Sequence, residues 1–142
     1  MILTEEMRRV VREQRLGFVA TVCADGTPNL SPKGTTAVWD DEHLIFADIR
    51  SPRTVANLRL NHTIEVNVVD PILRKGFRFK GTAEVVDGGD RLAEAIDFYR
   101  GQGVTSHIRA VVLIKVERAA PLISPIYDSG LTEDEVRKRW QR

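Results

Sequence analysis

The stretch Asp48–Asn61, D-I-R-S-P-R-T-V-A-N-L-R-L-N, is expected to hold the end of a strand and the helix that follows it. The short apolar run 44–47 in front of it fits a strand bounded by charged residues. Ser51 is a typical helix N-cap, and Pro52 suits the first helical position, where its missing N–H costs nothing. The helix carries an apolar stripe formed by Val55, Leu58 and, as a further candidate, Leu60.

The start of this helix carries an unusual charge. Helix N-termini favour Asp and Glu, because the aligned peptide dipoles place partial positive charge there. Here the chain has Arg50 and Arg53 instead, with Thr54 beside them. Two guanidinium groups, hydroxyl groups and free backbone N–H groups suit a phosphate. The alternative interpretation is a capped surface helix with two solvated arginines.

The composition predicts one domain covering residues 1–142. The formal net charge of +1 argues against a general nucleic-acid binder. We find no apolar run of membrane-spanning length and no signal-peptide pattern, so we expect a cytoplasmic protein without a membrane partner. The one cysteine, Cys23, excludes an internal disulfide and a cysteine-rich metal site, and the three histidines show no metal-ligand spacing.

Apolar and alternating runs elsewhere predict six or seven strands, mostly antiparallel. Pro28 and Pro32 suit an edge strand, or a strand that breaks and resumes, since proline cannot donate a ladder hydrogen bond. The segment 31–36 then offers a cation at Lys33 and close backbone approach at Gly34, although an ordinary bend in an edge strand has the same pattern. The expected elements are a helix over 4–15, strands at 17–23, 43–47, 63–69, 77–86 and 108–116, and a helix around 92–99.

The segment 119–142 is expected to be a C-terminal extension that leaves the sheet at Ala119–Pro121. Thr132–Glu135 has the pattern of a capping box, which predicts a short closing helix. Val136 and Trp140 lie on one face of it, and a helix this short needs a docking surface. We therefore expect Trp140 to dock on the protein's own barrel or on a neighbouring subunit, with the neighbour favoured.

The clustering of the strands predicts a mainly β (β+α) domain, a small closed or partly closed barrel with flanking helices. A doubly wound sheet is not supported, because strands and helices do not alternate strictly. The sequence has no G-x-G-x-x-G, no Walker loop and no nucleophile-elbow motif. Dinucleotide-fold, P-loop and α/β-hydrolase functions are therefore unsupported.

Within residues 17–86 the chain resembles the FMN-binding split-barrel superfamily, the group named for pyridoxamine 5′-phosphate oxidase. The matching pieces are G-F-V-A-T-V with D-G-T-P, S-P-K-G, L-I-F-A-D-I-R-S-P-R-T-V-A-N-L and G-F-R-F-K-G-T-A-E-V. The resemblance implies a split β-barrel that binds FMN, usually as a homodimer with the flavin at the subunit interface. It does not extend to the arginine- and histidine-bearing end with which the true oxidases hold their substrate phosphate, so it does not carry over activity on vitamin B6 phosphates.

The resemblance also implies cofactor-binding positions. The end of the edge strand would run along the isoalloxazine ring, with its lysine near the polar edge. The strand before the central helix would line the ring and the ribityl chain, and the start of that helix would hold the phosphate. These positions are Ser31, Pro32, Lys33 and Gly34; Ala47, Asp48 and Ile49; Ser51, Arg53, Thr54 and Asn57; and Arg78, which would reach the flavin from the other subunit.

The function that this resemblance implies is a small FMN-dependent oxidoreductase with a small-molecule electron donor or acceptor. No catalytic acid–base pair is visible in the sequence. One alternative is a non-catalytic electron carrier or flavin store. Another is a different ligand on the same fold: a deazaflavin, for which Arg74, Lys75, Arg78 and Lys80 would line a basic channel, or a haem with His43, His62 or His107 as axial ligand.

Overall fold

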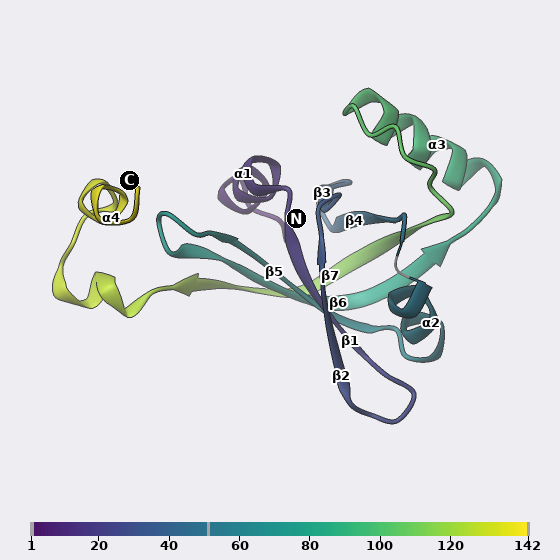
Figure 1. Ribbon diagram of the computed structural model, residues 1–142, viewed down its shortest axis with the longest axis horizontal. Helices are drawn as coiled ribbons and strands as arrows, with labels where there is room; N and C mark the ends of the chain where they lie inside the picture. Colours follow the sequence, from purple (N-terminus) through teal and green to yellow (C-terminus); the bar gives the residue numbers. More distant parts are fainter. Residues whose placement is uncertain (1, 51, 142) are drawn as a thin grey trace.

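One curled antiparallel sheet forms the centre of the molecule (Figure 1). The computed structural model describes residues 2–50 and 52–141. Over these residues seven strands follow the order β2-β1-β5-β6-β7-β4-β3, so the predicted mainly β split barrel with flanking helices is confirmed. The elements are α1 (Glu5–Gln14), β1 (Gly17–Val22), β2 (Pro28–Lys33), β3 (Ala37–Val38), β4 (His43–Asp48), α2 (Pro52–Leu60), β5 (Thr63–Asp70), β6 (Lys75–Val86), α3 (Gly89–Gly101), β7 (Ala110–Ile123), a 3-10 helix (Pro125–Ser129) and α4 (Glu133–Trp140).

Strand β4 is buried on both faces, which explains its unbroken apolar sequence. Leu44 and Phe46 belong to the main core, which also takes in side chains of α1 and α2. Ile45 and Ala47 belong to a second buried cluster with side chains of α3. A strand covered on both sides needs no polar alternation. Because β4 runs between these two clusters, its last residue, Asp48, is also buried.

Strand β2 lies at one edge of the sheet and pairs with β1 alone. Its two prolines, Pro28 and Pro32, therefore confirm the predicted edge strand. Strand β3 lies at the opposite edge, where it pairs with β4. The turn 34–36 thus joins the two outer edges of the sheet and brings the end of β2 towards β4.

Strands β6 and β7 form the longest pair and continue beyond the barrel as an arm (Figure 1). The prediction that the chain leaves the sheet at Ala119–Pro121 is wrong, because the proline still pairs with Phe77 of β6. Strand β4 pairs with β7 as far as Lys115, so along the arm the other side of β7 has no strand partner among the described residues. A proline is tolerated at such an open edge, since no partner strand needs its N–H.

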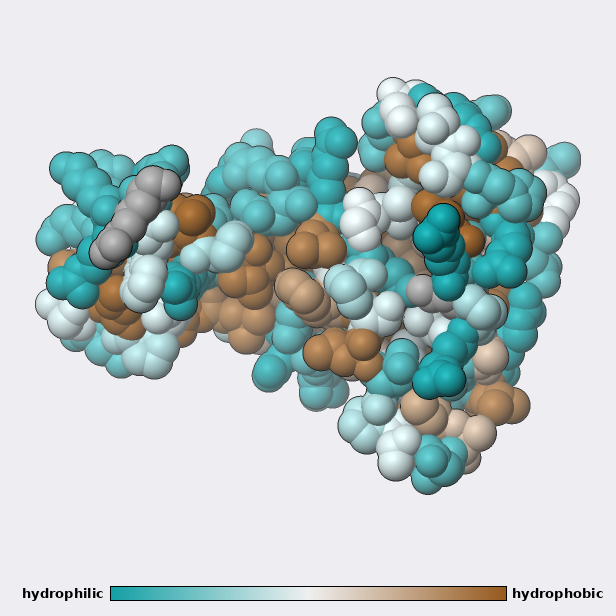
Figure 2. Space-filling model, viewed as in Figure 1, coloured by the Kyte–Doolittle hydropathy of each residue, from teal (hydrophilic) through white to brown (hydrophobic). Residues whose placement is uncertain are grey.

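The tail packs on its own chain at the tip of this arm. Thr132 and Glu135 form the predicted capping box at the start of α4. Cζ of Arg74 lies 4.0 Å from the centroid of the Trp140 ring, and Glu133 forms an ion pair with Lys75 of β6. Figure 1 places α4 at the opposite end of the molecule from α2 and α3, and Figure 2 shows apolar surface along the arm between the tail and the barrel. Contact between α4 and a neighbouring subunit stays a prediction.

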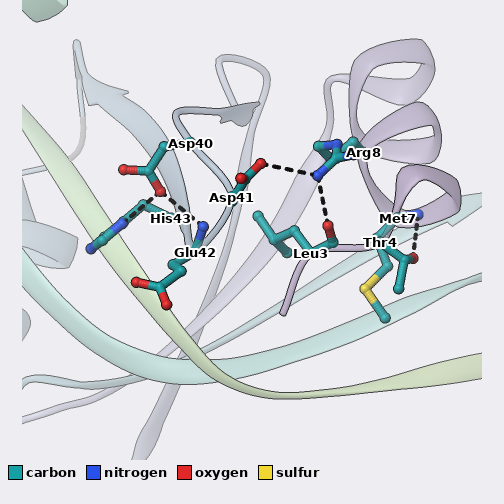
Figure 3. Close-up of polar contacts among 8 residues, drawn as sticks. All are labelled: Leu3, Thr4, Met7, Arg8, Asp40, Asp41, Glu42 and His43. Carbon is teal, nitrogen blue, oxygen red and sulfur yellow. Dashed lines mark hydrogen bonds and ion pairs between the residues drawn. The ribbon is translucent and has the colours of Figure 1, made fainter. Parts of the chain in front are cut away.

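Helix α1 is anchored to the turn between β3 and β4 (Figure 3). The Leu3 N–H donates to the Asp41 carbonyl at 3.1 Å. The Arg8 guanidinium donates to the Leu3 carbonyl at 2.8 Å and to the Asp41 carboxylate at 3.2 Å. Thr4 caps the helix as predicted by accepting from the Met7 N–H. These contacts hold α1 against the same part of the sheet that carries β4.

None of the described helices is both long enough and apolar enough to cross a membrane.

Candidate functional site

The structure brings the end of β2 and the end of β4 together through the turn that joins the two sheet edges. Thr35 in this turn accepts a hydrogen bond from the Ala47 N–H at 2.9 Å. Lys33, the last residue of β2, lies close enough to Asp48, the last residue of β4, for their charges to interact. Helix α2 then follows β4 along the chain. Residues far apart in sequence thus meet where the resemblance places a flavin.

Lys33 is a buried cation at this meeting point. The residue is 6% exposed, and its Nζ lies 5.8 Å from the centroid of the Phe46 ring. Burial lowers the pKa of the Lys33 ammonium, and the negative charge of Asp48 opposes part of that change. The Lys33 carbonyl accepts from the Thr36 hydroxyl at 2.8 Å, which fixes the backbone at the end of β2. The site therefore holds a desolvated positive charge in a defined place.

Asp48 supplies the matching negative charge. Its side chain is 7% exposed, and its Oδ1 lies 3.8 Å from an Nη of Arg109. The Arg109 N–H also donates to the Asp48 carbonyl at 3.2 Å. Sequence reasoning did not select Arg109, because only the pairing of β4 with β7 places these two residues side by side. Beside Gly34 there is open space, since a Cβ there would meet nothing within 4 Å.

The start of α2 has the charge that the sequence predicted. No acidic residue occupies its first turn, and Thr54 is 2% exposed. Arg50 and Arg53 are exposed, and neither side chain has a hydrogen-bond or ion-pair partner within residues 2–50 and 52–141. The predicted N-cap and phosphate ligand Ser51 lies outside the described residues. Leu60, offered as part of the apolar stripe, is 73% exposed, so that expectation is wrong.

Asn57 faces the core rather than the open end of α2. The residue is 6% exposed, and its Nδ2 donates to the Thr21 hydroxyl of β1 at 3.0 Å. The same nitrogen lies 3.7 Å from Sγ of Cys23. These contacts tie α2 to β1, and a contact of Asn57 with the cofactor stays a prediction.

Replacing Asn57 by alanine should lower the free energy of unfolding by about 1–3 kcal/mol, because the buried Thr21 hydroxyl loses its partner. Urea denaturation measures this change. A Thr21→Val and Asn57→Ala double-mutant cycle isolates the pair. Unchanged stability together with lost flavin affinity would instead place Asn57 in the cofactor site.

Within one chain, Arg78 lies apart from the other predicted cofactor-binding residues. It lies on β6 opposite Asn67 and Ala120, with β7 between its strand and β4. Its Nε forms an ion pair with Glu65 at 3.1 Å, and Lys80 lies 3.4 Å from the same carboxylate. A contact between Arg78 and the flavin of another subunit stays a prediction.

The remaining predicted residues are neighbours of Lys33 and Asp48 along the chain. Ser31 and Pro32 lead along the edge strand to Lys33, and Ile49 packs against the α3 cluster. Sequence reasoning missed Tyr99, whose hydroxyl donates to the Thr35 carbonyl at 2.8 Å and so holds the turn. Burial raises the pKa of Tyr99, which keeps it a neutral donor.

Within residues 2–50 and 52–141 no cluster of three or more His, Cys, Asp or Glu side chains is placed to hold a metal ion. His43, one of the candidate haem ligands, has its Nδ1 2.7 Å from the Asp40 carboxylate (Figure 3). The other two histidines, His62 and His107, are exposed.

Comparison with known proteins agrees with this fold. HupZ of Group A Streptococcus superposes with a TM-score of 0.77 at 37% identity, covering 85% of this chain and 94% of that one. An uncharacterized protein of Methanocaldococcus jannaschii is 30% identical over 99 residues, which make up 67% of this chain and 65% of that relative. An FMN-binding protein of Syntrophomonas wolfei shares the fold at 17% identity, with a TM-score of 0.70 and coverage of 84% and 85%. The sequence profile named pyridoxamine 5′-phosphate oxidase matches residues 3–122, and the chain therefore belongs to the pyridoxamine 5′-phosphate oxidase family.

Proposed function

We propose that this protein is an FMN-binding flavoprotein and a small oxidoreductase, with the cofactor where the ends of β2 and β4 lie near the start of α2. The observation that carries the proposal is the start of α2, where Arg50 and Arg53 have no partner among the described residues and no acid stands in the first turn. Such a helix end is complementary to a phosphate group. Membership of the family supports FMN as the source of that phosphate.

The residues next to α2 fit the rest of FMN. Gly34 leaves its backbone open to a flat ring, and the buried Lys33 offers a positive charge beside it. Negative charge on a reduced flavin would be stabilised by such a cation, because burial keeps water from screening it. The backbone at Ala47 and Asp48 would line the ring and the ribityl chain at the end of β4.

When bound, FMN supplies hydride or electron transfer. The chain's own residues would bind and orient it: Arg53, Thr54 and the first N–H groups of α2 at the phosphate, and Lys33 at the ring. We propose a homodimer in which Arg78 of one subunit reaches the flavin of the other. No residue is assigned to proton transfer.

The state of the other cations supports FMN over a deazaflavin. A deazaflavin would call for a broad basic channel lined by Arg74, Lys75, Arg78 and Lys80. In the structure Arg74 stacks on Trp140, Lys75 pairs with Glu133, and the other two pair with Glu65. Arg74 and Lys75 are therefore engaged with the tail and less available to a ligand, whereas Arg78 stays the residue proposed to reach the flavin of the other subunit.

The visible absorption spectrum of the freshly purified protein, followed by heat release and mass identification of any chromophore, tests the proposal. Released FMN, or stoichiometric uptake of added FMN, is expected. Bleaching by NADH or NADPH would then distinguish an oxidoreductase from a flavin carrier. A protein that fails to take up FMN but binds a deazaflavin or haem would overturn the cofactor assignment.

Replacing Lys33 by methionine should lower the flavin reduction potential more than it weakens FMN binding. The substitution keeps the length of the side chain and removes the cation that stabilises the reduced ring. Redox titration of the bound flavin measures the potential, and Lys33→Arg is the charge-preserving control. An unchanged potential in the methionine variant would remove Lys33 from its proposed role.

We also expect the burial of Lys33 to make the free energy of unfolding depend on pH, and the methionine variant to reduce that dependence. Since burial lowers the folded-state pKa of Lys33, the unfolded chain binds more protons at alkaline pH. The free energy of unfolding of the wild type should therefore gain a contribution as pH rises towards about 10. Urea denaturation of the FMN-free protein should show a smaller gain in Lys33→Met; equal gains would contradict the burial of a charged Lys33.

A further inference from the structure

A cavity of about 330 Å³ lies between α1, the β2–β3 turn and α3, apart from the predicted phosphate position at α2. Figure 1 shows α1 and α3 on either side of β3. The cavity volume is in the range typical of small-ligand sites. Its charged lining is Arg12 and Arg15 at the C-terminal end of α1, and no acid stands among the described residues around it. The rest of the wall contains the side chains of Thr35, Phe98, Gln102 and Val104.

The two arginines of this cavity have no side-chain partner among the described residues. Within the described ranges neither guanidinium takes part in a hydrogen bond or an ion pair. Arg9, one turn earlier on α1, instead pairs with Glu6 at 2.6 Å and with Glu13 at 3.0 Å. Two like charges on one wall repel each other, and an anion between them would remove that repulsion.

Arg15 also occupies a backbone position that suits glycine. Its φ is 58°, in the left-handed region, and its N–H caps α1 by donating to the Val11 carbonyl. Glycine is the usual residue at such a helix end, because a Cβ is disfavoured there. Arg15 therefore lines the cavity although its backbone conformation is strained.

The opposite wall of the cavity is held in place by hydrogen bonds. Tyr99 is fully buried, and its hydroxyl donates to the Thr35 carbonyl. Thr36 donates to the Lys33 carbonyl, so the same turn borders both the cavity and the end of β2. A ligand in the cavity would thus lie against the turn that follows Lys33.

We infer that this cavity binds a small organic anion with an aromatic or apolar body. Arg12 and Arg15 would hold its carboxylate or phosphate through charge-assisted hydrogen bonds. Phe98 and Val104 would contact its body, and Gln102 would provide a further polar contact. The inference goes beyond flavin binding and does not rest on it.

Titration of the FMN-free, ¹⁵N-labelled protein with benzoate and with phenyl phosphate tests the site, with benzyl alcohol as the neutral probe. Both anions should give saturable shifts of the Phe98, Gln102 and Val104 amide signals, which lie outside the proposed flavin site. Arg12→Gln and Arg15→Gly should each weaken binding about tenfold or more, the effect of losing one charge-assisted contact. Arg59→Gln removes a cation at the far end of α2, where Arg59 pairs with Asp87, and should leave the affinity unchanged.

The Arg15→Gly variant distinguishes a loss of anion binding from a loss of stability. Because glycine relieves the strained φ, the thermal midpoint of this variant should stay equal to that of the wild type or rise, while binding falls. Absence of saturable shifts, equal shifts with benzyl alcohol, or full binding by an Arg12→Gln and Arg15→Gly double variant would overturn the site. Shifts confined to α2 and abolished by Arg53→Ala would place the anion at the phosphate position instead. FMN uptake is measured separately, so failure of one proposal does not imply failure of the other.

Discussion

Replacing Arg53 by alanine should weaken FMN binding by about 2–3 kcal/mol, which is roughly 30- to 150-fold in Kd. The side chain is exposed at the first turn of α2 and has no partner within residues 2–50 and 52–141, so its removal leaves no buried group unsatisfied. The lost energy is therefore that of a charge-assisted contact with the phosphate. Titration of the FMN-free protein, followed by flavin fluorescence, measures the change.

Two matched variants show whether this effect belongs to the phosphate site. Arg53→Lys keeps the charge but not the forked geometry, and should bind more tightly than the alanine variant. Arg59→Ala removes a cation of the same helix at its other end and should leave FMN affinity unchanged. Riboflavin, which lacks the phosphate, should bind the wild type and Arg53→Ala equally. Unchanged FMN affinity in Arg53→Ala would refute the phosphate assignment.

Replacing Phe46 by alanine should lower the free energy of unfolding by about 3–5 kcal/mol. Phe46 is fully buried in β4 and belongs to the main core, so the shortened side chain leaves a cavity that the surrounding strands cannot fill. The substitution also removes the ring that lies 5.8 Å from the Lys33 ammonium. Urea denaturation of the FMN-free protein at neutral pH measures the loss.

Phe46→Leu is the matched control, because it keeps most of the apolar volume and removes the aromatic ring. It should lose much less stability than the alanine variant, while the Lys33 ammonium loses its contact with the ring. A loss below about 1 kcal/mol in Phe46→Ala would contradict the central position of β4 in the core.

Local sequence patterns correctly predicted the features that are set by residues close together in the sequence. Pro28 and Pro32 marked an edge strand because proline lacks a ladder donor wherever it stands. The Thr132–Glu135 capping box closes within four residues and needs no tertiary partner. The basic start of α2 is likewise a property of consecutive residues.

Contacts between distant segments could not be predicted, because local sequence patterns carry no information about them. The arm could not be predicted from the sequence. Pro121 is tolerated in β7 because β4 no longer pairs with β7 at that point, and the residues near Pro121 give no sign of where β4 ends. The side of a helix that faces the core depends on the sheet beneath it. The sequence therefore did not indicate that the Asn57 amide donates to Thr21, and its predicted contact with the cofactor stays a prediction.

The sequence by itself determined the strand-rich fold, the edge strand, the capped tail helix and the cationic start of α2, because periodicity, proline chemistry and helix dipoles act over a few residues. Only the tertiary structure decided that Lys33 is buried beside Asp48, that Arg109 accompanies this carboxylate, and that Arg12 and Arg15 border a cavity. Burial and charge pairing arise from strand order and helix docking. These bring together residues as far apart as Asp48 and Arg109, whose separation along the chain gives no local signal.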